Sequence, residues 1–359
     1  MKYLQRSGEM KSGLLVATRL NALKINHRNW CEALESAYFL MIAVSPGEVI
    51  CITGPSRAGK SKLINELKKI IESEHSYEDT GLMPVVIMTA ANTSTNGRFS
   101  TKSFTRRMLN AVNHPFHKYD GATGITSTKE LSEDTCRDRL ESALAIRGVK
   151  YLIIDEAQHA RYVSKDAQGS YAVMDSWKCL AETAGLVLII VGAYPILPII
   201  NNSPHMIGRK YSVELGRYKY NKEDISEFAL IVKAYGEVLE ETELLMENIE
   251  FFYRGSMGCI GLLRRWIIAA VSESKRKRTP LCMKNFVDSI MPDRDLREVS
   301  LEIRNGEEYL QSKFYEDTQK SNEPSSVTPK ATKKKPKGKP GNRKPARYEI
   351  NNLLGEKSA

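Results

Sequence analysis

The sequence predicts an α/β fold, in which a parallel β-sheet is covered by helices and is followed by a smaller helical region. Four apolar runs of strand length, separated by helical patterns, indicate the sheet: residues 49–53, 84–88, 151–154 and 186–192. A glycine-rich turn follows the first run directly, and from about residue 221 the pattern becomes wholly helical. Strands with no polar face are typical of a parallel sheet that has helices on both sides.

The remaining elements follow in a regular order. An apolar stripe at helical spacing predicts a helical N-terminal region packed on the main domain: Trp30, Leu34, Ala37, Tyr38 and Met41. Helices are expected at 132–147 and 168–184, and a fifth strand at 211–215. Four further helices are expected at 222–235, 239–253, 259–274 and 281–290. These patterns predict four regions: 1–46, 47–220, 221–317 and 318–359.

The glycine-rich turn has the pattern Gly-x-x-x-x-Gly-Lys-Ser, which is typical of a phosphate-binding loop. Glycines let the backbone curl, so that successive N–H groups and the positive end of the following helix face a phosphate. Lys60 is expected to reach the β- and γ-phosphates, and Ser61 to bind Mg²⁺. The residues expected to hold the nucleotide are Gly54, Pro55, Ser56, Arg57, Ala58, Gly59, Lys60 and Ser61.

The buried run 151–154 ends in two carboxylates, Asp155 and Glu156. We expect Asp155 to hold the Mg²⁺ shell and Glu156 to polarise the water that attacks the γ-phosphate. Asp-Glu after an apolar run is weak evidence alone, but its pairing with the loop predicts a site for ATP and Mg²⁺. An α/β core followed by a small helical lid is the arrangement of the AAA+ superfamily of P-loop NTPases, in which loss of the γ-phosphate is coupled to domain rotation.

The net charge of +10 is concentrated near the C-terminus. Nine positive side chains with no acid among them leave the rest of the chain near +1: Lys330, Lys333, Lys334, Lys335, Lys337, Lys339, Arg343, Lys344 and Arg347. Prolines and glycines are frequent here too, so residues 318–346 are predicted to be a disordered basic tail. Two interpretations stay open, a solubilising linker and an arm that binds the DNA backbone. The apolar residues 348–354 are either a docking peptide or a frayed end.

A second basic feature follows the second predicted strand. Residues 91–98 are polar and free of acids, and the helix predicted after them carries Lys102, Arg106 and Arg107. Hydroxyl, amide and guanidinium groups supply most contacts to nucleic-acid backbones. We therefore expect DNA contacts from Asn96, Arg98, Lys102 and Arg106, with a merely solvated helix face as the alternative.

Several other classes are disfavoured. No window has the length of a transmembrane helix and no signal pattern opens the chain, so a cytoplasmic protein is expected. The six cysteines form no Cys-x-x-Cys pair, which disfavours a zinc site or disulfide framework and predicts reduced, mostly buried thiols. No carboxylate cluster indicates strand cleavage, and no recognition helix indicates sequence-specific reading of DNA.

Three stretches make the chain similar to the ATPase regulators of transposons, the TnsC/TniB group: Tyr-Leu-Ile-Ile-Asp-Glu-Ala-Gln-His at 151–159, Leu-Val-Leu-Ile-Ile-Val-Gly at 186–192 and Gly-Cys-Ile-Gly-Leu-Leu-Arg at 258–264. The likeness covers roughly residues 30–290. It implies an ATPase of the bacterial cytoplasm that assembles head-to-tail on double-stranded DNA, as rings or filaments, and links a target-selecting protein to a transposase. It also implies a sensor arginine at Arg264 and an arginine finger at Arg209, with Lys210 and Arg217 as alternative fingers.

One position departs from the pattern of related ATPases. They place Thr or Asn after the fourth strand to orient the attacking water, where this chain has Ala193 and Tyr194. Hydrolysis is therefore expected to be slow, which suits a switch, and Gln158 or Tyr194 is the candidate for the missing role. Two other functions stay open, a helicase loader or replication initiator and a nucleotide-gated signalling or defence protein. The sequence shows neither a helix-turn-helix after the lid nor an internal repeat.

Overall fold

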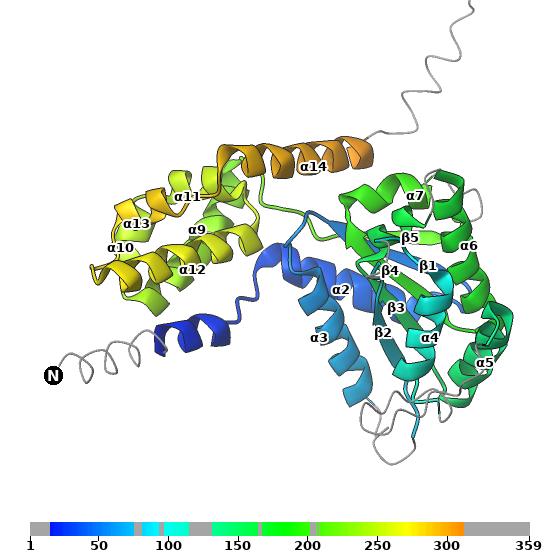
Figure 1. Cartoon of the computed structure of the whole chain (residues 1–359). Helices are drawn as coiled ribbons and strands as arrows, with labels where there is room; N and C mark the ends of the chain where they lie inside the picture. Colours follow the sequence, from blue (N-terminus) through cyan, green and yellow to red (C-terminus); the bar gives the residue numbers. More distant parts are fainter. Residues whose placement is uncertain are drawn as a thin grey trace, which may run out of the picture. The chain divides into compact units, whose positions relative to one another are not determined.

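The computed structural model describes residues 15–74, 81–92, 97–114, 131–163, 167–201, 206 and 208–311. All of these residues belong to one compact unit, 1–311. Figure 1 shows its elements coloured along the sequence. The predicted basic tail, the apolar residues 348–354, residues 115–130 and Asn96 lie outside the described residues.

A five-stranded parallel sheet organises the first part of this unit (Figure 1). Its strands stand in the order β2-β3-β4-β1-β5, with the bounds β1 (Val49–Gly54), β2 (Val85–Thr89), β3 (Tyr151–Asp155), β4 (Val187–Ala193) and β5 (Lys210–Glu214). The predicted α/β class and the fifth strand are confirmed. Gly54 pairs with Ala193, and Thr89 pairs with Asp155. Because the strands are parallel, their carboxyl ends meet at one edge of the sheet.

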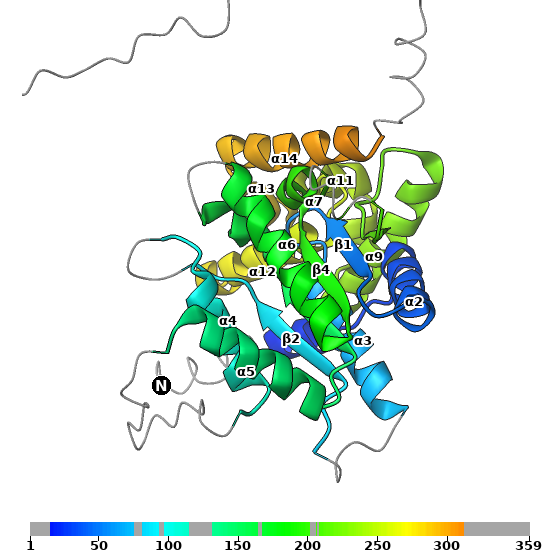
Figure 2. The ribbon, with the colours of Figure 1, turned by 90° about the vertical axis from the view of Figure 1, so that its right-hand side faces the viewer.

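Helices cover both faces of the sheet, because successive side chains of each strand point to opposite faces. One face packs on α2 (Arg28–Ala43) and α3 (Lys60–Ser73). The other packs on four helices, which Figure 2 places in front of the strands: α4 (Thr101–Ala111), α5 (Glu133–Ile146), α6 (Ala167–Ala184) and α7 (Leu197–Asn201). Ala37 and Met41 of α2 are buried against the sheet, so the predicted N-terminal stripe does pack on the main domain.

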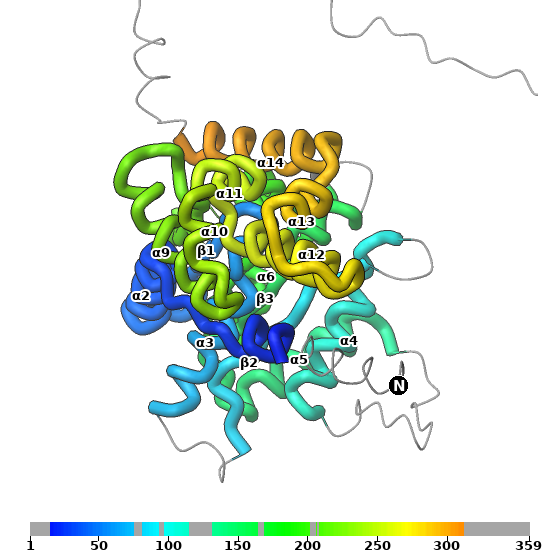
Figure 3. Tube along the Cα trace, turned by 90° about the vertical axis from the view of Figure 1, so that its left-hand side faces the viewer, coloured from blue at the N-terminus to red at the C-terminus, as the bar shows by residue number. Residues whose placement is uncertain are grey.

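A helical region follows β5 and has a hydrophobic core of its own. Its helices stand together in front of the sheet in Figure 3: α9 (Lys222–Leu239), α10 (Thr242–Met246), α11 (Ile249–Ser256), α12 (Ile260–Lys277) and α13 (Met283–Asp288). Residues 15–22 are also helical, and Leu20 is buried in this core. We call this region the lid.

The single helix expected at 239–253 is wrong, because the chain breaks twice within it. Glu240 ends α9 in the left-handed conformation, with φ +61°. This turn lets α10 fold back so closely that a Cβ on Gly236 would lie 2.7 Å from Cα of Thr242. A tight packing contact therefore overrides the good helix propensity of these residues.

The last described helix, α14 (Asp293–Gln311), was not among the expected helices. It runs from the lid towards the core along the top of Figure 1. Ile303 packs with Cys259 and Leu262 of the lid. On the core side, Gly306 lies so close to Tyr194 that a Cβ would come within 2.2 Å of its ring. The helix thus contacts both parts of the unit.

Two smaller expectations concern cysteines and membranes. All six thiols are free, and three of them are buried, Cys51, Cys136 and Cys259, so half rather than most lie in the core. Within the described ranges, no helix combines the length and the apolar character that crossing a bilayer requires.

Candidate nucleotide-binding site

The glycine-rich loop joins the end of β1 to the start of α3. Gly59 caps α3 with φ +106°, a conformation that favours glycine. Gly54 ends β1 so close to the segment after β5 that a Cβ on it would lie 2.2 Å from the carbonyl oxygen of Leu215. No side chain caps the first turn of α3, so its N–H groups face the loop. Both glycines are therefore required by geometry, and the loop presents donors at a helix N-terminus.

Lys60 and Ser61 lie at the start of α3 and face the loop and the end of β3, respectively. The Lys60 ammonium donates to the carbonyl oxygens of Gly54 at 3.0 Å and of Pro55 at 2.8 Å. Lys60 is only 7% exposed, and burial lowers its pKa, although the carboxylates of Glu156, Glu302 and Asp155 act in the opposite direction. A buried ammonium held by two carbonyl oxygens is a cation positioned for a phosphate.

Asp155 and Glu156 stand at the end of β3, beside Ser61. The Ser61 hydroxyl donates to Oδ2 of Asp155 at 2.7 Å, which joins the two predicted Mg²⁺ ligands. The other Asp155 oxygen, Oδ1, accepts the backbone N–H of Glu156 at 2.8 Å. Glu156 itself has φ +54°, a left-handed conformation that is costly for a residue other than glycine and marks functional sites.

Gln158 connects Glu156 with the end of β4. Its amide nitrogen donates to the Glu156 carboxylate, and its amide oxygen accepts the backbone N–H of Ala193 at 3.2 Å. Gly192 permits this approach, since a Cβ there would lie 2.7 Å from the Gln158 amide oxygen. A side chain from the turn after β3, the 3-10 helix η2 (Ala157–Tyr162), therefore contacts the backbone at the end of β4.

Tyr194, the other candidate for that role, makes different contacts. It lies in the 3-10 helix η3 (Tyr194–Ile196) and is 2% exposed. Its hydroxyl donates to the Glu214 carboxylate at 2.7 Å, and burial together with this bond raises its pKa. Of the two candidates, it is Gln158 that the structure brings against Glu156.

These residues fit a Mg²⁺–nucleotide. A buried ammonium, uncapped N–H groups and a hydroxyl paired with a carboxylate are the donor set that phosphates and a hard cation require. Lys60 and the loop would hold the phosphates, while Ser61 and Asp155 would hold Mg²⁺.

A scan against protein-family models matches residues 44–200 to the family described as "AAA domain". The sheet, the loop and both carboxylates of the site lie in this range, except for β5. Residues 44–200 form an AAA domain. No curated protein matches the chain.

Three solved structures are similar to the chain at low identity. The Walker-type ATPase PABY2304 of Pyrococcus abyssi is 14% identical, with a TM-score of 0.47, over 81% of this chain and 75% of that chain. The Aeropyrum pernix ORC2 protein in its ADP form is 15% identical, with a TM-score of 0.49, over 74% and 68% of the two chains. The Drosophila ORC bound to DNA is 14% identical, with a TM-score of 0.49, over 77% and 64%. Similarity at this level does not extend to function.

The lid touches the phosphate-binding loop of the AAA domain through the start of α12. A Cβ on Gly261 would lie 2.0 Å from the carbonyl oxygen of Arg57. One turn further on, Arg264 donates to Asn21 Oδ1 at 2.8 Å and lies 3.5 Å from the carbonyl oxygen of Leu20. Arg264 thus binds the N-terminal helical segment in this structure, and its role as a γ-phosphate sensor stays a prediction.

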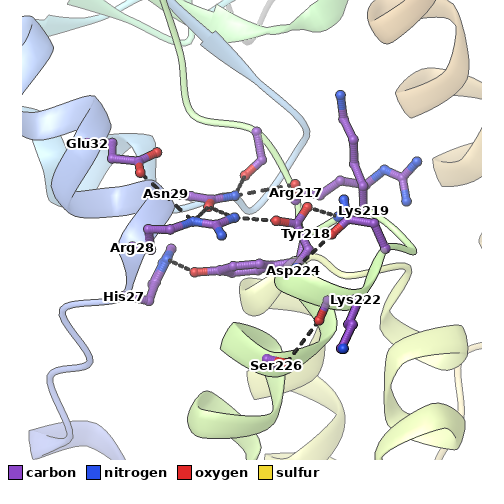
Figure 4. Close-up of polar contacts among 12 residues, drawn as sticks. His27, Arg28, Asn29, Glu32, Arg217, Tyr218, Lys219, Lys222, Asp224 and Ser226 are labelled. Atoms are coloured by element: carbon purple, nitrogen blue, oxygen red, sulfur yellow. Dashed lines mark hydrogen bonds and ion pairs between the residues drawn. The ribbon is translucent and has the colours of Figure 1, made fainter.

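A polar cluster joins the start of α2 to the segment that leads into the lid (Figure 4). Arg28 forms an ion pair with Asp224, and its guanidinium lies 5.5 Å from the ring centre of Tyr218. His27 Nδ1 lies 3.1 Å from the Tyr218 hydroxyl and accepts the backbone N–H of Trp30 at 3.4 Å. Because Nδ1 is an acceptor for Trp30, Tyr218 is the donor in the other bond. The cluster fixes the segment 216–224, through which the lid leaves the sheet.

The three candidates for the arginine finger have different surroundings. Arg209 precedes β5, is half exposed and pairs with Glu182. Lys210 begins β5, and burial lowers its pKa. Arg217 is not a surface charge, because its guanidinium donates to both oxygens of Glu307 at 2.8 and 3.0 Å. Arg209 keeps the exposure that a contact with another subunit needs, and this role stays a prediction.

The residues expected to contact DNA lie before and along α4. Arg98 and Arg106 are exposed, and Lys102 is half buried. Arg107, on the same helix, faces inward, where its guanidinium donates to the carbonyl oxygens of Thr89 and Ala91. Arg107 therefore braces the end of β2. The roles of the other three in DNA binding stay predictions.

Glu302 of α14 contacts the phosphate-binding loop, although no sequence pattern indicates it. Its carboxylate accepts the backbone N–H of Ser56 at 3.1 Å, and the Ser56 hydroxyl lies 2.9 and 3.0 Å from its two oxygens. Pro292 followed by two acidic residues and an apolar stripe is a helix-start signal that would have revealed α14. No local pattern pairs Glu302 with a residue 246 positions away.

Proposed function

We propose that the protein is an ATPase that uses ATP and Mg²⁺ as a switch. The observation that carries this proposal is the 2.7 Å contact between Ser61 and Asp155, beside the buried Lys60 ammonium. When bound, Mg²⁺ neutralises phosphate charge that develops during transfer. Lys60 and the N–H groups of the loop bind and orient the phosphates. Glu156 accepts a proton from, or polarises, the attacking water.

Gln158 is proposed to position Glu156. Its amide nitrogen holds the Glu156 carboxylate, while its amide oxygen is fixed by the backbone of Ala193. A carboxylate oxygen that already accepts an amide N–H has less capacity left for the attacking water. This arrangement supports slow turnover and therefore a long-lived ATP state.

The proposed cellular role is an ATP-dependent regulator of transposition that oligomerises on double-stranded DNA in the bacterial cytoplasm. It is supported by the resemblance of residues 151–159, 186–192 and 258–264 to the TnsC/TniB group. Arg98 and Arg106 are exposed, as contacts to a DNA backbone require. Arg209 is proposed as the finger offered to the next subunit, and a target selector and a transposase are the proposed partners.

Calorimetry of nucleotide binding tests the ATPase proposal. Lys60→Ala is expected to abolish ATP binding, and Glu156→Gln is expected to keep binding while stopping hydrolysis. Lys62→Ala is the matched control, because Lys62 lies two residues on in the same helix. Unchanged ATP binding by Lys60→Ala would refute the proposal.

Negative-stain microscopy tests assembly on DNA. The protein is imaged with double-stranded DNA, with and without a slowly hydrolysed ATP analogue, at moderate salt. Rings or filaments that need both DNA and nucleotide are expected, and Arg98→Glu or Arg106→Glu should weaken them. Lone particles from protein that does bind ATP would favour a loader or a gated signalling ATPase. Binding of a transposase to the assembled wild type, but not to Lys60→Ala, tests the coupling.

A further inference from the structure

Glu302 places a negative charge on a loop whose donors are suited to phosphate. It takes the backbone N–H of Ser56 and lies within hydrogen-bond distance of the same residue's hydroxyl with both carboxylate oxygens. These are an N–H and an O–H of the kind that bind a phosphate oxygen in such loops. A carboxylate and a phosphate oxygen therefore compete for the same donors.

The carboxylate is held there by a firmly packed helix. Glu307, one turn and a half further along α14, makes the two-pronged ion pair with Arg217, and both side chains are less than a quarter exposed. Gly306 rests on the ring of Tyr194, and Ile303 is 3% exposed in a cluster with Cys259 and Leu262. Contacts with both the lid and the core, made by the residues that follow Glu302, thus hold the backbone that carries it.

Glu302 lies at the part of the loop where a terminal phosphate is expected. The Lys60 ammonium bonds the carbonyl oxygens of Gly54 and Pro55, directly before Ser56. In loops of this type the lysine reaches the β- and γ-phosphates, whereas the helix N-terminus, here Gly59 to Ser61, cradles the inner phosphates. The negative charge of Glu302 also acts on the Lys60 ammonium and opposes the lowering of its pKa by burial. A γ-phosphate therefore meets Glu302 more closely than an α- or β-phosphate does.

We propose that Glu302 is a specificity-determining residue that lowers the affinity of the site for nucleoside triphosphates relative to diphosphates. The inference rests on the proposed nucleotide-binding function. ADP leaves the contact between Glu302 and Ser56 in place. ATP displaces the Glu302 carboxylate. Because the carboxylate is carried by α14, which contacts both the core and the lid, the binding of ATP shifts this helix. The contact therefore makes the position of α14 depend on the γ-phosphate.

Isothermal titration calorimetry with ADP and with AMP-PNP, both with Mg²⁺, tests the proposal on the full chain. Glu302→Gln removes the charge and keeps the shape of the side chain. It is expected to increase the affinity for AMP-PNP about tenfold relative to ADP, the scale of a charged hydrogen bond. Glu298→Gln is the matched control, since Glu298 is an exposed glutamate one turn earlier on the same helix, and it should leave the ratio of affinities unchanged.

The outcomes separate the two levels of the proposal. A changed ratio in Glu302→Gln alone supports it. Equal changes for both ligands, no change, or an equal effect of Glu298→Gln would overturn it while leaving the ATPase proposal intact. Absence of nucleotide binding by the wild type would overturn the ATPase proposal itself. ADP binding reports that a variant is folded, and if Glu302→Gln fails this check, Glu302→Ala provides the same comparison.

Discussion

The ion pair between Arg217 and Glu307 offers a direct test of how α14 is held. Arg217 follows β5, whereas Glu307 belongs to α14, and their side chains are 22% and 16% exposed. The change Arg217→Met removes both bonds to Glu307 and a 3.3 Å bond to the carbonyl oxygen of Met257. Breaking a fully buried pair costs about 3–5 kcal/mol, so for this partly exposed pair we expect about 2 kcal/mol.

Scanning calorimetry without nucleotide measures this loss. At about 2 °C for each kcal/mol in a chain of this size, Arg217→Met should lower Tm by about 4 °C. Arg254→Met is the control, because Arg254 pairs with Glu250 at a site where the side chains are 73% and 58% exposed, so its loss should lower Tm much less. Equal shifts for both variants would refute the reasoning.

A double variant measures the cost of leaving the Glu307 carboxylate without its partner. Most of the cost of Arg217→Met is expected to come from leaving the Glu307 carboxylate largely buried without its partner. Replacing Glu307 by Leu in the same chain removes that charge and should recover about half of the lost Tm. If the double variant melts below Arg217→Met, packing rather than charge dominates at this contact.

Three further predictions concern the site and its supports. Gln158→Ala frees the Glu156 carboxylate and should raise the rate of phosphate release at saturating ATP about tenfold without changing nucleotide affinity, and an unchanged rate would remove Gln158 from the mechanism. Gly261→Ala should lower Tm by several degrees, because its Cβ meets the Arg57 carbonyl, whereas Gly208→Ala, with open space around it, should not. Burial lowers the pKa of His27 from 6.5 to about 4, so between these pH values the unfolded chain binds more protons than the folded one. Urea unfolding should therefore show that about 2 kcal/mol of stability is lost from pH 7 to pH 5. His27→Asn should not show this loss.

The sheet and the nucleotide loop follow from local sequence because their causes are local. A fully buried parallel strand needs a continuous apolar run, and the run ending at Asp155 has one. The loop needs glycine at Gly59 because its φ is +106°. Such requirements restrict which residue types can occupy these positions, and for this reason the strands and the loop could be predicted from the sequence.

The lid and α14 depend on contacts that no local pattern records. The break at Glu240 occurs in a run of good helix formers, and its cause is the approach of α10 to Gly236. The contact of Glu302 with Ser56 joins two residues 246 positions apart. A glutamate on an exposed-looking helix is normally solvated, so only the fold reveals that this one faces the loop.

Three glycines of the lid and α14 lie at close backbone approaches. Gly258 has φ +71°, and a Cβ there would lie 2.1 Å from the carbonyl oxygen of Tyr218. Gly261 meets the loop, and Gly306 meets Tyr194 beside the end of β4. Contacts at this range allow little sliding, so a displacement at the loop is passed on as rotation of whole elements rather than absorbed by side chains. This rigidity is what a switch needs, since a change the size of one phosphate must alter a surface far from it.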